Sequence, residues 1–270
     1  MKVLFCGDVM GKAGRKVVLD YMPDIRRKLG LDFVVVNGEN AAHGFGITPG
    51  ICNAFFDVGV DAITTGNHVW DRREIMNYID GEPRLLRPLN YPSGTPGSGA
   101  TLFDAADGRK VLVVQMMGAL FMTPLDDPFA ATQAALAPYH LGKTADCILV
   151  DVHAEANSEK MAMGHLLDGR VSIVVGSHCH IPTADTQILP GGTAYQTDAG
   201  MCGDYDSVIG MVKDAAVARF TDPGVRNRLE PAVGEGTLCA LYAEIDDTTG
   251  LALRAEPLRL GGRLMPQWPG

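Results

Sequence analysis

The chain has 270 residues, of which 46% are hydrophobic and 20% are charged. This composition disfavours disorder and suits one globular domain over residues 1–270 with a substantial core. A formal net charge of -9 disfavours an extended nucleic-acid surface, since phosphate backbones are held chiefly by lysine and arginine. No uncharged apolar run approaches the roughly 20 residues that span a bilayer, and the N-terminal apolar run is too short for a secretory signal. We therefore expect a cytoplasmic protein without a membrane partner.

Predicted strands and helices alternate from the N-terminus. The apolar run KVLFCGD at 2–8 predicts a strand, the spacing of apolar residues over 14–30 predicts a helix, and LDFVVVNGEN at 31–40 predicts a second buried strand. Such alternation indicates an α/β protein with a largely parallel sheet that is covered on both faces. The pattern recurs as strands within 61–68, 110–118, 145–155 and 171–180, with helices over 128–139 and 158–167.

The C-terminal part of the chain departs from this alternation. Two strand-like runs, at 237–246 and 251–260, are joined by a short polar segment and predict an antiparallel hairpin. The segment NYPSGTPGSG at 90–99 is rich in proline and glycine and predicts a surface loop before another strand. Neither feature marks a domain boundary.

Polar side chains gather where the predicted strands end. In VSIVVGSHCH, His178 and His180 follow an apolar run, and alternating residues of an extended chain point to one side, so both imidazoles should leave in one direction. Ligands of open α/β sheets bind at the carboxyl ends of the strands, where the loops converge. The other polar residues at such ends are Asp8, Glu39, Asn40, Asn67, His68 and His153.

These residue types together predict a metal site. A mixture of carboxylate, amide and imidazole ligands suits iron, manganese, zinc or cobalt, whereas calcium and magnesium prefer oxygen ligands alone. The seven candidate ligands exceed what one tetrahedral ion needs, so two divalent transition-metal ions that share a carboxylate are expected, with iron or manganese preferred. The ligand candidates are Asp8, Glu39, Asn40, Asn67, His153, His178 and His180.

Five segments carry a family resemblance. They resemble, in chain order, the five metallophosphoesterase blocks of the calcineurin-like superfamily: GDVMG at 7–11, NGEN at 37–40, GNHVWD at 66–71, DVHAE at 151–155 and GSHCH at 176–180. The chain more closely resembles the YmdB-type phosphodiesterases, including NGENAAHGFGIT at 37–48 and YQTDAGMCGDYDSVIGM at 195–211. The resemblance implies a four-layer α/β/β/α sandwich and hydrolysis of small phosphodiesters, with 2′,3′-cyclic nucleotides as the expected substrates.

Two departures from the wider superfamily affect the expected ligands. Met10 occupies a position where the first block usually has histidine, and Glu39 stands where the second block usually has aspartate. The closer resemblance implies that the amide oxygen of Asn40 replaces the missing ligand. On this basis Glu39 bridges the two ions, one ion is held by Asp8, Asn40 and His180, and the other is held by Asn67, His153 and His178.

The expected chemistry is attack by solvent. Two ions can hold a water or hydroxide, lower its pKa and stabilise the phosphoryl oxygens during in-line attack. The resemblance makes His68 the proton donor to the departing oxygen, with an eighth ligand or a support for the ligands as the alternative. Asp71 or Glu155 would orient His68 or the ligands. His43 and Tyr205 are weaker candidates for substrate contact, because each also suits a loop without a catalytic role.

Three alternatives remain open at the level of sequence. A dinucleotide-binding protein is disfavoured, because GDVMGKAG lacks the G-x-G-x-x-G spacing and Glu39 lies beyond the usual offset of about 20 residues. A metal-dependent phosphomonoesterase or nucleotidase would use the same ligands. A non-catalytic nucleotide-binding regulator would not need His68. An assembly of identical chains is compatible with each of them.

Overall fold

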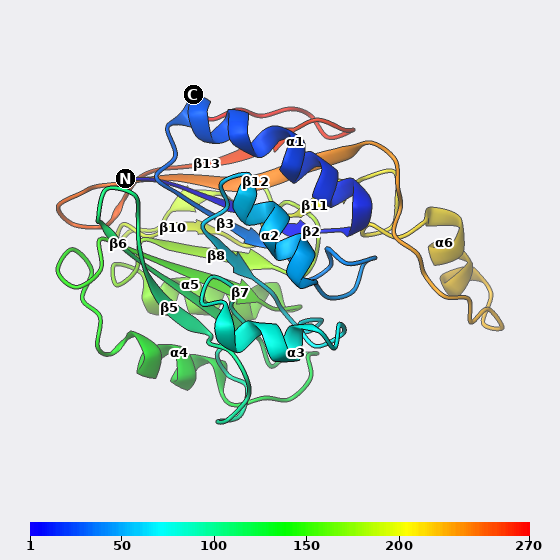
Figure 1. Cartoon of the computed structure of the whole chain (residues 1–270), viewed down its shortest axis with the longest axis horizontal. Coiled ribbons are helices and arrows are strands. Elements are labelled where there is room, and N and C mark those ends of the chain that lie inside the picture. The colour runs from blue at the N-terminus through cyan, green and yellow to red at the C-terminus, as the bar shows by residue number, and fades with distance from the viewer.

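The computed structural model describes residues 1–270 and contains two mixed β-sheets with helices packed against them (Figure 1). In the first sheet, β1 (Lys2–Cys6) runs parallel to β3 (Phe33–Asn37) and antiparallel to β12 (Gly236–Ile245), so the C-terminal part of the chain pairs directly with the N-terminal strand. Its seven strands lie in the order β2 (Asp8–Val9), β11 (Met201–Asp204), β12 (Gly236–Ile245), β1 (Lys2–Cys6), β3 (Phe33–Asn37) and β4 (Ala62–Thr64), with β13 (Ala252–Leu260) also paired to β12.

The second sheet has a parallel centre and antiparallel edges. The prediction of one largely parallel sheet is therefore wrong. A continuous run of apolar residues indicates a strand that is buried on both faces. The run is the same whether a helix or another sheet covers the second face of the strand. The six strands lie in the order β5 (Ala100–Asp104), β6 (Lys110–Met117), β7 (Cys147–His153), β8 (Ile173–Ser177), β10 (Ala194–Gln196) and β9 (Gln187–Ile188).

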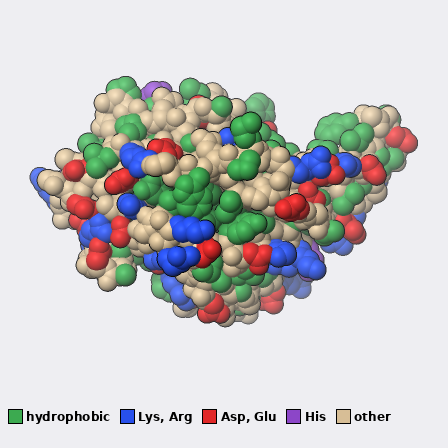
Figure 2. Space-filling model, turned by 90° about the horizontal axis from the view of Figure 1, so that it is seen from above, with side chains coloured by type: hydrophobic (Ala, Val, Ile, Leu, Met, Phe, Trp, Pro, Cys, Tyr) green, Lys and Arg blue, Asp and Glu red, His purple; other side chains and the backbone are tan.

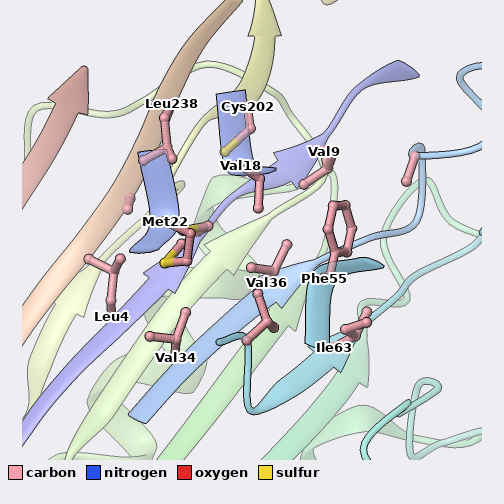
Figure 3. Close-up of a cluster of buried hydrophobic side chains, with 14 of the residues drawn as sticks. Leu4, Val9, Val18, Met22, Val34, Val36, Phe55, Ile63, Cys202 and Leu238 are labelled. Carbon is pink, nitrogen blue, oxygen red and sulfur yellow. The ribbon is translucent and has the colours of Figure 1, made fainter. Parts of the chain in front are cut away.

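Alternating residues of the central strands enter different clusters of buried side chains. Val34 and Val36 of β3 pack with Met22 and Phe55 from helices α1 (Gly11–Leu29) and α2 (Pro49–Asp57) (Figure 3). The intervening Val35 belongs to another cluster, which combines residues of both sheets. A third cluster joins residues of β6, β7 and β8 to those of α4 (Pro128–Leu136) and α5 (Asn157–Leu167). The period of two in a strand thus places successive side chains in separate cores.

The helices begin and end at residues with suitable backbone chemistry. The hydroxyl of Thr48 accepts a hydrogen bond from the N–H of Ile51 at the start of α2, and Pro49 occupies its first turn. Helix α1 ends at Gly30, which has a φ of 63°. The helices are α1 (Gly11–Leu29), α2 (Pro49–Asp57), α3 (Ile75–Tyr78), the 3-10 helix η1 (Ile79–Gly81), α4 (Pro128–Leu136), α5 (Asn157–Leu167) and α6 (Lys213–Thr221).

Helix α6 projects from the body of the molecule, at the right of Figure 1 and of Figure 2.

The predicted C-terminal hairpin is confirmed, because β12 and β13 pair antiparallel over most of their length. The segment at 90–99 leads into β5 as a loop, as predicted. None of the helices combines the length and the apolar character that crossing a membrane requires.

Candidate metal centre

The predicted ligands converge from strand ends of both sheets. Asp8 begins β2 directly after β1, Glu39 and Asn40 follow β3, and Asn67 follows β4. From the second sheet, His153 is the last residue of β7, while His178 and His180 follow β8. The structure therefore brings together all seven residues that the sequence predicts as ligands.

Two groups of ligand atoms share one carboxylate. Glu39 lies with His153 and His178 in one group and with Asp8 and His180 in the other, and the ligand atoms within each group are within 4.8 Å of one another. A glutamate common to both groups has the position that a bridging ligand requires. The His153 Nε2 atom lies 3.2 Å from Glu39 Oε1.

The two asparagines lie next to different ligand groups. The amide oxygen of Asn40 lies 3.1 Å from His180 Nε2, and that of Asn67 lies 3.0 Å from His153 Nε2. Each amide oxygen thus adjoins a different group, in the division expected from the resemblance. Their role as metal ligands stays a prediction.

Neighbouring groups orient the histidine rings. Ser177 Oγ lies 2.9 Å from His153 Nδ1 and donates a hydrogen bond of 2.6 Å to Asp151. His180 Nδ1 donates to the carbonyl of Ile209 over 2.8 Å. With the Nδ1 atoms engaged in this way, the Nε2 atoms of both rings face the convergent carboxylates, which is the arrangement usual around protein-bound metals.

One buried carboxylate oxygen indicates that the centre suits a cation. Asp8 is fully buried, and its Oδ2 accepts a hydrogen bond of 3.0 Å from the N–H of His178. Its Oδ1 has no hydrogen-bond partner. A buried polar atom without a partner costs free energy, and a cation among these carboxylates would remove that cost. The donor set therefore fits divalent transition metals.

The charges of the metal-free centre follow from burial and from the contact between Glu39 and His153. Burial alone would raise the pKa of Glu39, but the charge and hydrogen bond of His153 outweigh it and lower the pKa to about 2. Burial would lower the pKa of His153, whereas the carboxylates of Glu39 and Asp8 raise it to about 9. Burial, reinforced by His153, lowers the pKa of His178 to about 3, and burial also lowers the pKa of His180.

The reasoning from strand alternation for the two histidines after β8 is wrong. The strand ends at Ser177, and His178 and His180 have φ values of 94° and 67°, so they lie in a left-handed turn and not in an extended segment. They consequently enter different ligand groups. A local alternation rule could not reveal this turn, because contacts from distant parts of the chain hold it.

These contacts come from three other elements. Asp198 Oδ2 accepts hydrogen bonds from the N–H of Cys179 over 3.0 Å and from the buried Lys160 over 2.8 Å. The hydroxyl of Tyr205 donates to the carbonyl of His180 over 3.1 Å and accepts from the N–H of Met201 over 2.9 Å. Tyr205 is therefore engaged in supporting the turn, and it does not line the cavity above the centre.

A cavity of about 510 Å³ opens over the two groups. His68 lies on its wall, with Nδ1 2.9 Å from Asp71 Oδ2 and its ring edge against Phe45. Glu155 also lines the cavity, and its Oε2 lies 3.2 Å from His178 Nε2. The two acidic residues expected to orient neighbours thus contact different histidines.

Sequence reasoning missed two basic residues that line this cavity. Arg219 and Arg228, from α6 and the segment after it, line the cavity. No motif could have indicated them, because only the path of the chain brings this projecting segment over the strand ends. His43 is exposed and lies in an adjacent cavity.

The two-sheet α/β fold and the His, Asp and Glu groups at its strand ends define the chain as a candidate metalloenzyme. A family model described as "YmdB-like protein" matches residues 4–258. The chain belongs to this family. It is 45% identical over 256 residues to the 2′,3′-cyclic-nucleotide 2′-phosphodiesterase of Bacillus subtilis, covering 95% of this chain and 96% of that protein.

Solved structures agree with this assignment. A hypothetical protein from Thermus thermophilus matches with a TM-score of 0.90 and 42% identity, covering 97% of this chain and 100% of that one. A structure described as a novel phosphatase from Mycoplasma pneumoniae matches with a TM-score of 0.89 and 32% identity, covering 97% and 93% of the two chains. These relatives support the assignment of the chain to the phosphoric diester hydrolases.

Proposed function

We propose that the chain is a metal-dependent phosphodiesterase that hydrolyses small phosphodiesters, with 2′,3′-cyclic nucleotides as the substrate class. The observation that carries this proposal is the pair of ligand groups that share Glu39 beneath a cavity lined by His68. The cavity volume of about 510 Å³ lies within the range of small-ligand sites. The Bacillus relative, which is named for this activity, supports the substrate class.

The donor set supports two divalent transition-metal ions, with iron or manganese preferred and zinc or cobalt next. When bound, such ions supply positive charge that lowers the pKa of an attacking water and stabilises the phosphoryl oxygens. Glu39 would contact both ions, Asp8, Asn40 and His180 would hold one, and Asn67, His153 and His178 would hold the other.

His68 is the proposed proton donor to the leaving oxygen. A ribose alkoxide is a poor leaving group, so it requires a proton as its bond to phosphorus breaks. The hydrogen bond from Nδ1 to Asp71 leaves Nε2 as the nitrogen able to deliver that proton. The contact with Asp71 fixes the orientation of the ring, and the ring makes an edge-to-face contact with Phe45. Phe45 and Ile209 add apolar walls that suit a nucleobase.

The proposal extends to the architecture, in which residues 1–270 form one domain with a four-layer α/β/β/α arrangement. The buried cluster that combines residues of both sheets supports the two inner layers. The clusters that include α1 and α2 on one side and α4 and α5 on the other support the helical layers. Pairing of β12 with β1 ties the two ends of the chain into the same sheet.

Replacement of His68 tests the role of this residue. General acid catalysis contributes about 10²–10⁴-fold, so His68→Ala should lose a rate of that order on adenosine 2′,3′-cyclic phosphate. It should lose much less on bis(4-nitrophenyl) phosphate, whose leaving group spreads its charge over the ring. Bound metal, measured in the same preparation by mass spectrometry, should stay unchanged. Equal losses on both substrates would exclude proton donation, and a fall in bound metal would indicate a ligand.

A substrate panel separates the proposal from its two alternatives. Protein reconstituted with manganese or iron should hydrolyse 2′,3′-cyclic nucleotides faster than nucleoside monophosphates. A preference for monoesters with negligible diesterase activity would favour a phosphomonoesterase, in keeping with the relative described as a phosphatase. Tight nucleotide binding without turnover by metal-loaded protein would favour the regulator. Full activity in metal-free protein would contradict the metal-dependent mechanism.

A further inference from the structure

A second cavity of about 400 Å³ adjoins the cavity over the metal centre. The two cavities share Arg228 and Leu229 in their walls, so they lie side by side. The second cavity contains none of the candidate metal ligands, and its polar walls are formed mainly by basic residues. These are Lys12, Arg72 and Arg228, with His43 and a single carboxylate from Glu230.

This grouping of cations is unusual for such an acidic chain, which has 32 acidic and 23 basic residues, not counting histidine. Neither Lys12 nor Arg228 forms an ion pair, and Arg72 donates to the carbonyls of Phe45 and Ala42 without contacting a carboxylate. Glu230 forms no ion pair either. Lys12 lies in the first turn of α1, where no acidic residue offsets the positive end of the helix dipole. The cavity therefore carries uncompensated positive charge.

We infer that the second cavity binds a further phosphate of the substrate while the cyclic phosphate lies at the metal centre. The inference rests on the proposed function and makes its substrate class more specific. The preferred substrate is then a nucleoside 2′,3′-cyclic phosphate that carries another phosphate on its 5′ oxygen. That group is either a terminal phosphate or the diester that links it to a preceding nucleotide.

The chemistry of the cavity supports one phosphate and not a long nucleic acid. Phosphate is held by convergent lysine, arginine and backbone N–H groups. A polynucleotide requires a basic surface that continues along several phosphates, whereas Glu230 lies at this cavity and the net charge of the chain is -9. The second phosphate is bound without being cleaved, because the ligand groups lie under the other cavity.

The test compares kcat/KM for three substrates on metal-loaded enzyme: adenosine 2′,3′-cyclic phosphate, its 5′-phosphorylated form, and a dinucleotide that ends in the cyclic phosphate. Partly exposed ion pairs contribute about two- to fivefold each, so several of them should favour the 5′-phosphorylated substrate by about tenfold at low salt. Added salt should reduce this preference. If kcat/KM is raised for the dinucleotide as well, the second cavity accepts a phosphodiester. If kcat/KM is raised only for the 5′-phosphorylated nucleotide, the cavity accepts only a terminal phosphate.

Two substitutions with matched controls locate the effect. Lys12→Gln and Arg228→Gln should each lower the preference for the 5′-phosphorylated substrate by about two- to fivefold. Lys16→Gln, one turn further along α1, and Arg226→Gln, in the same segment as Arg228, remove cations that do not line the cavity. These two controls should retain the preference of the unaltered protein.

Equal kcat/KM for the singly and doubly phosphorylated nucleotides in the unaltered protein would overturn the inference. An unchanged preference in Lys12→Gln and Arg228→Gln would overturn it as well. If no cyclic nucleotide is hydrolysed, the proposed function fails, and calorimetric binding of the 5′-phosphorylated nucleotide then tests the cavity separately. Weaker binding to Lys12→Gln than to Lys16→Gln would support the phosphate site, and equal binding would refute it.

Discussion

Metal uptake by the metal-free protein should release a proton from His153. The carboxylates of Glu39 and Asp8 outweigh the effect of burial and raise the pKa of this imidazole to about 9. A histidine binds metal only when the binding nitrogen is deprotonated. A proton and a metal ion therefore compete for His153 at neutral pH.

The size of this competition follows from the pKa. At pH 7 the ring lies two units below its pKa of about 9, so the apparent metal affinity should be about 100-fold lower than for the neutral ring. Affinity should rise about tenfold per pH unit from pH 7 to 9 and then level off. The low pKa of His178, about 3, and the lowered pKa of His180 mean that these two rings are already neutral.

Titration calorimetry with Mn²⁺ measures this release directly. Experiments in buffers with different ionisation enthalpies give the number of protons released, which should be close to one or higher at pH 7. An affinity that does not change between pH 7 and 9, with no proton released, would refute the ion pair between His153 and Glu39 as the state of the metal-free centre.

The same pKa has a consequence for stability. The folded protein holds the His153 proton more tightly than the unfolded chain, whose histidine pKa is about 6.5. The resulting stabilisation of metal-free protein, on the order of 3 kcal/mol, is complete below about pH 6.5 and is lost as pH rises through about 9. Urea denaturation at pH 6 and pH 9.5 checks the sign of this change.

Two further predictions concern the bridging ligand and the core. Glu39→Gln should lower metal occupancy in both ligand groups, whereas His180→Ala should empty chiefly one of them. The ratio of bound metal to protein measures both effects. Two tightly held ions and normal turnover in Glu39→Gln would contradict the role of Glu39 as a bridging ligand. Phe55→Ala should lower the free energy of unfolding by about 3–5 kcal/mol, because this ring is fully buried between α2 and the first sheet. Phe220 is 86% exposed, so Phe220→Ala is the control and should change the free energy of unfolding by less than about 0.5 kcal/mol.

Most of the polar residues that meet at the centre could be predicted from the order of residues along the chain. Asp8, Glu39, Asn67, His153 and His178 each lie at or just beyond the carboxyl end of an apolar run, and that position is visible locally. Because ligands of α/β sheets bind beyond the carboxyl ends of the strands, a shared site for these residues could be predicted without knowledge of the layers. The C-terminal hairpin was equally visible, since its two strands are adjacent along the chain.

The number of sheets that carry these strand ends, and the residues that surround the centre, depend on contacts between distant parts of the chain. Val34 and Val35 are both buried, yet one faces α1 and the other the second sheet, and an apolar residue has the same character in either place. Lys160 and Asp198 hold the left-handed turn of the histidines across a long separation along the chain. Arg228 reaches both cavities from the segment after α6. Such contacts leave no local pattern, because they depend on where the completed fold places each segment.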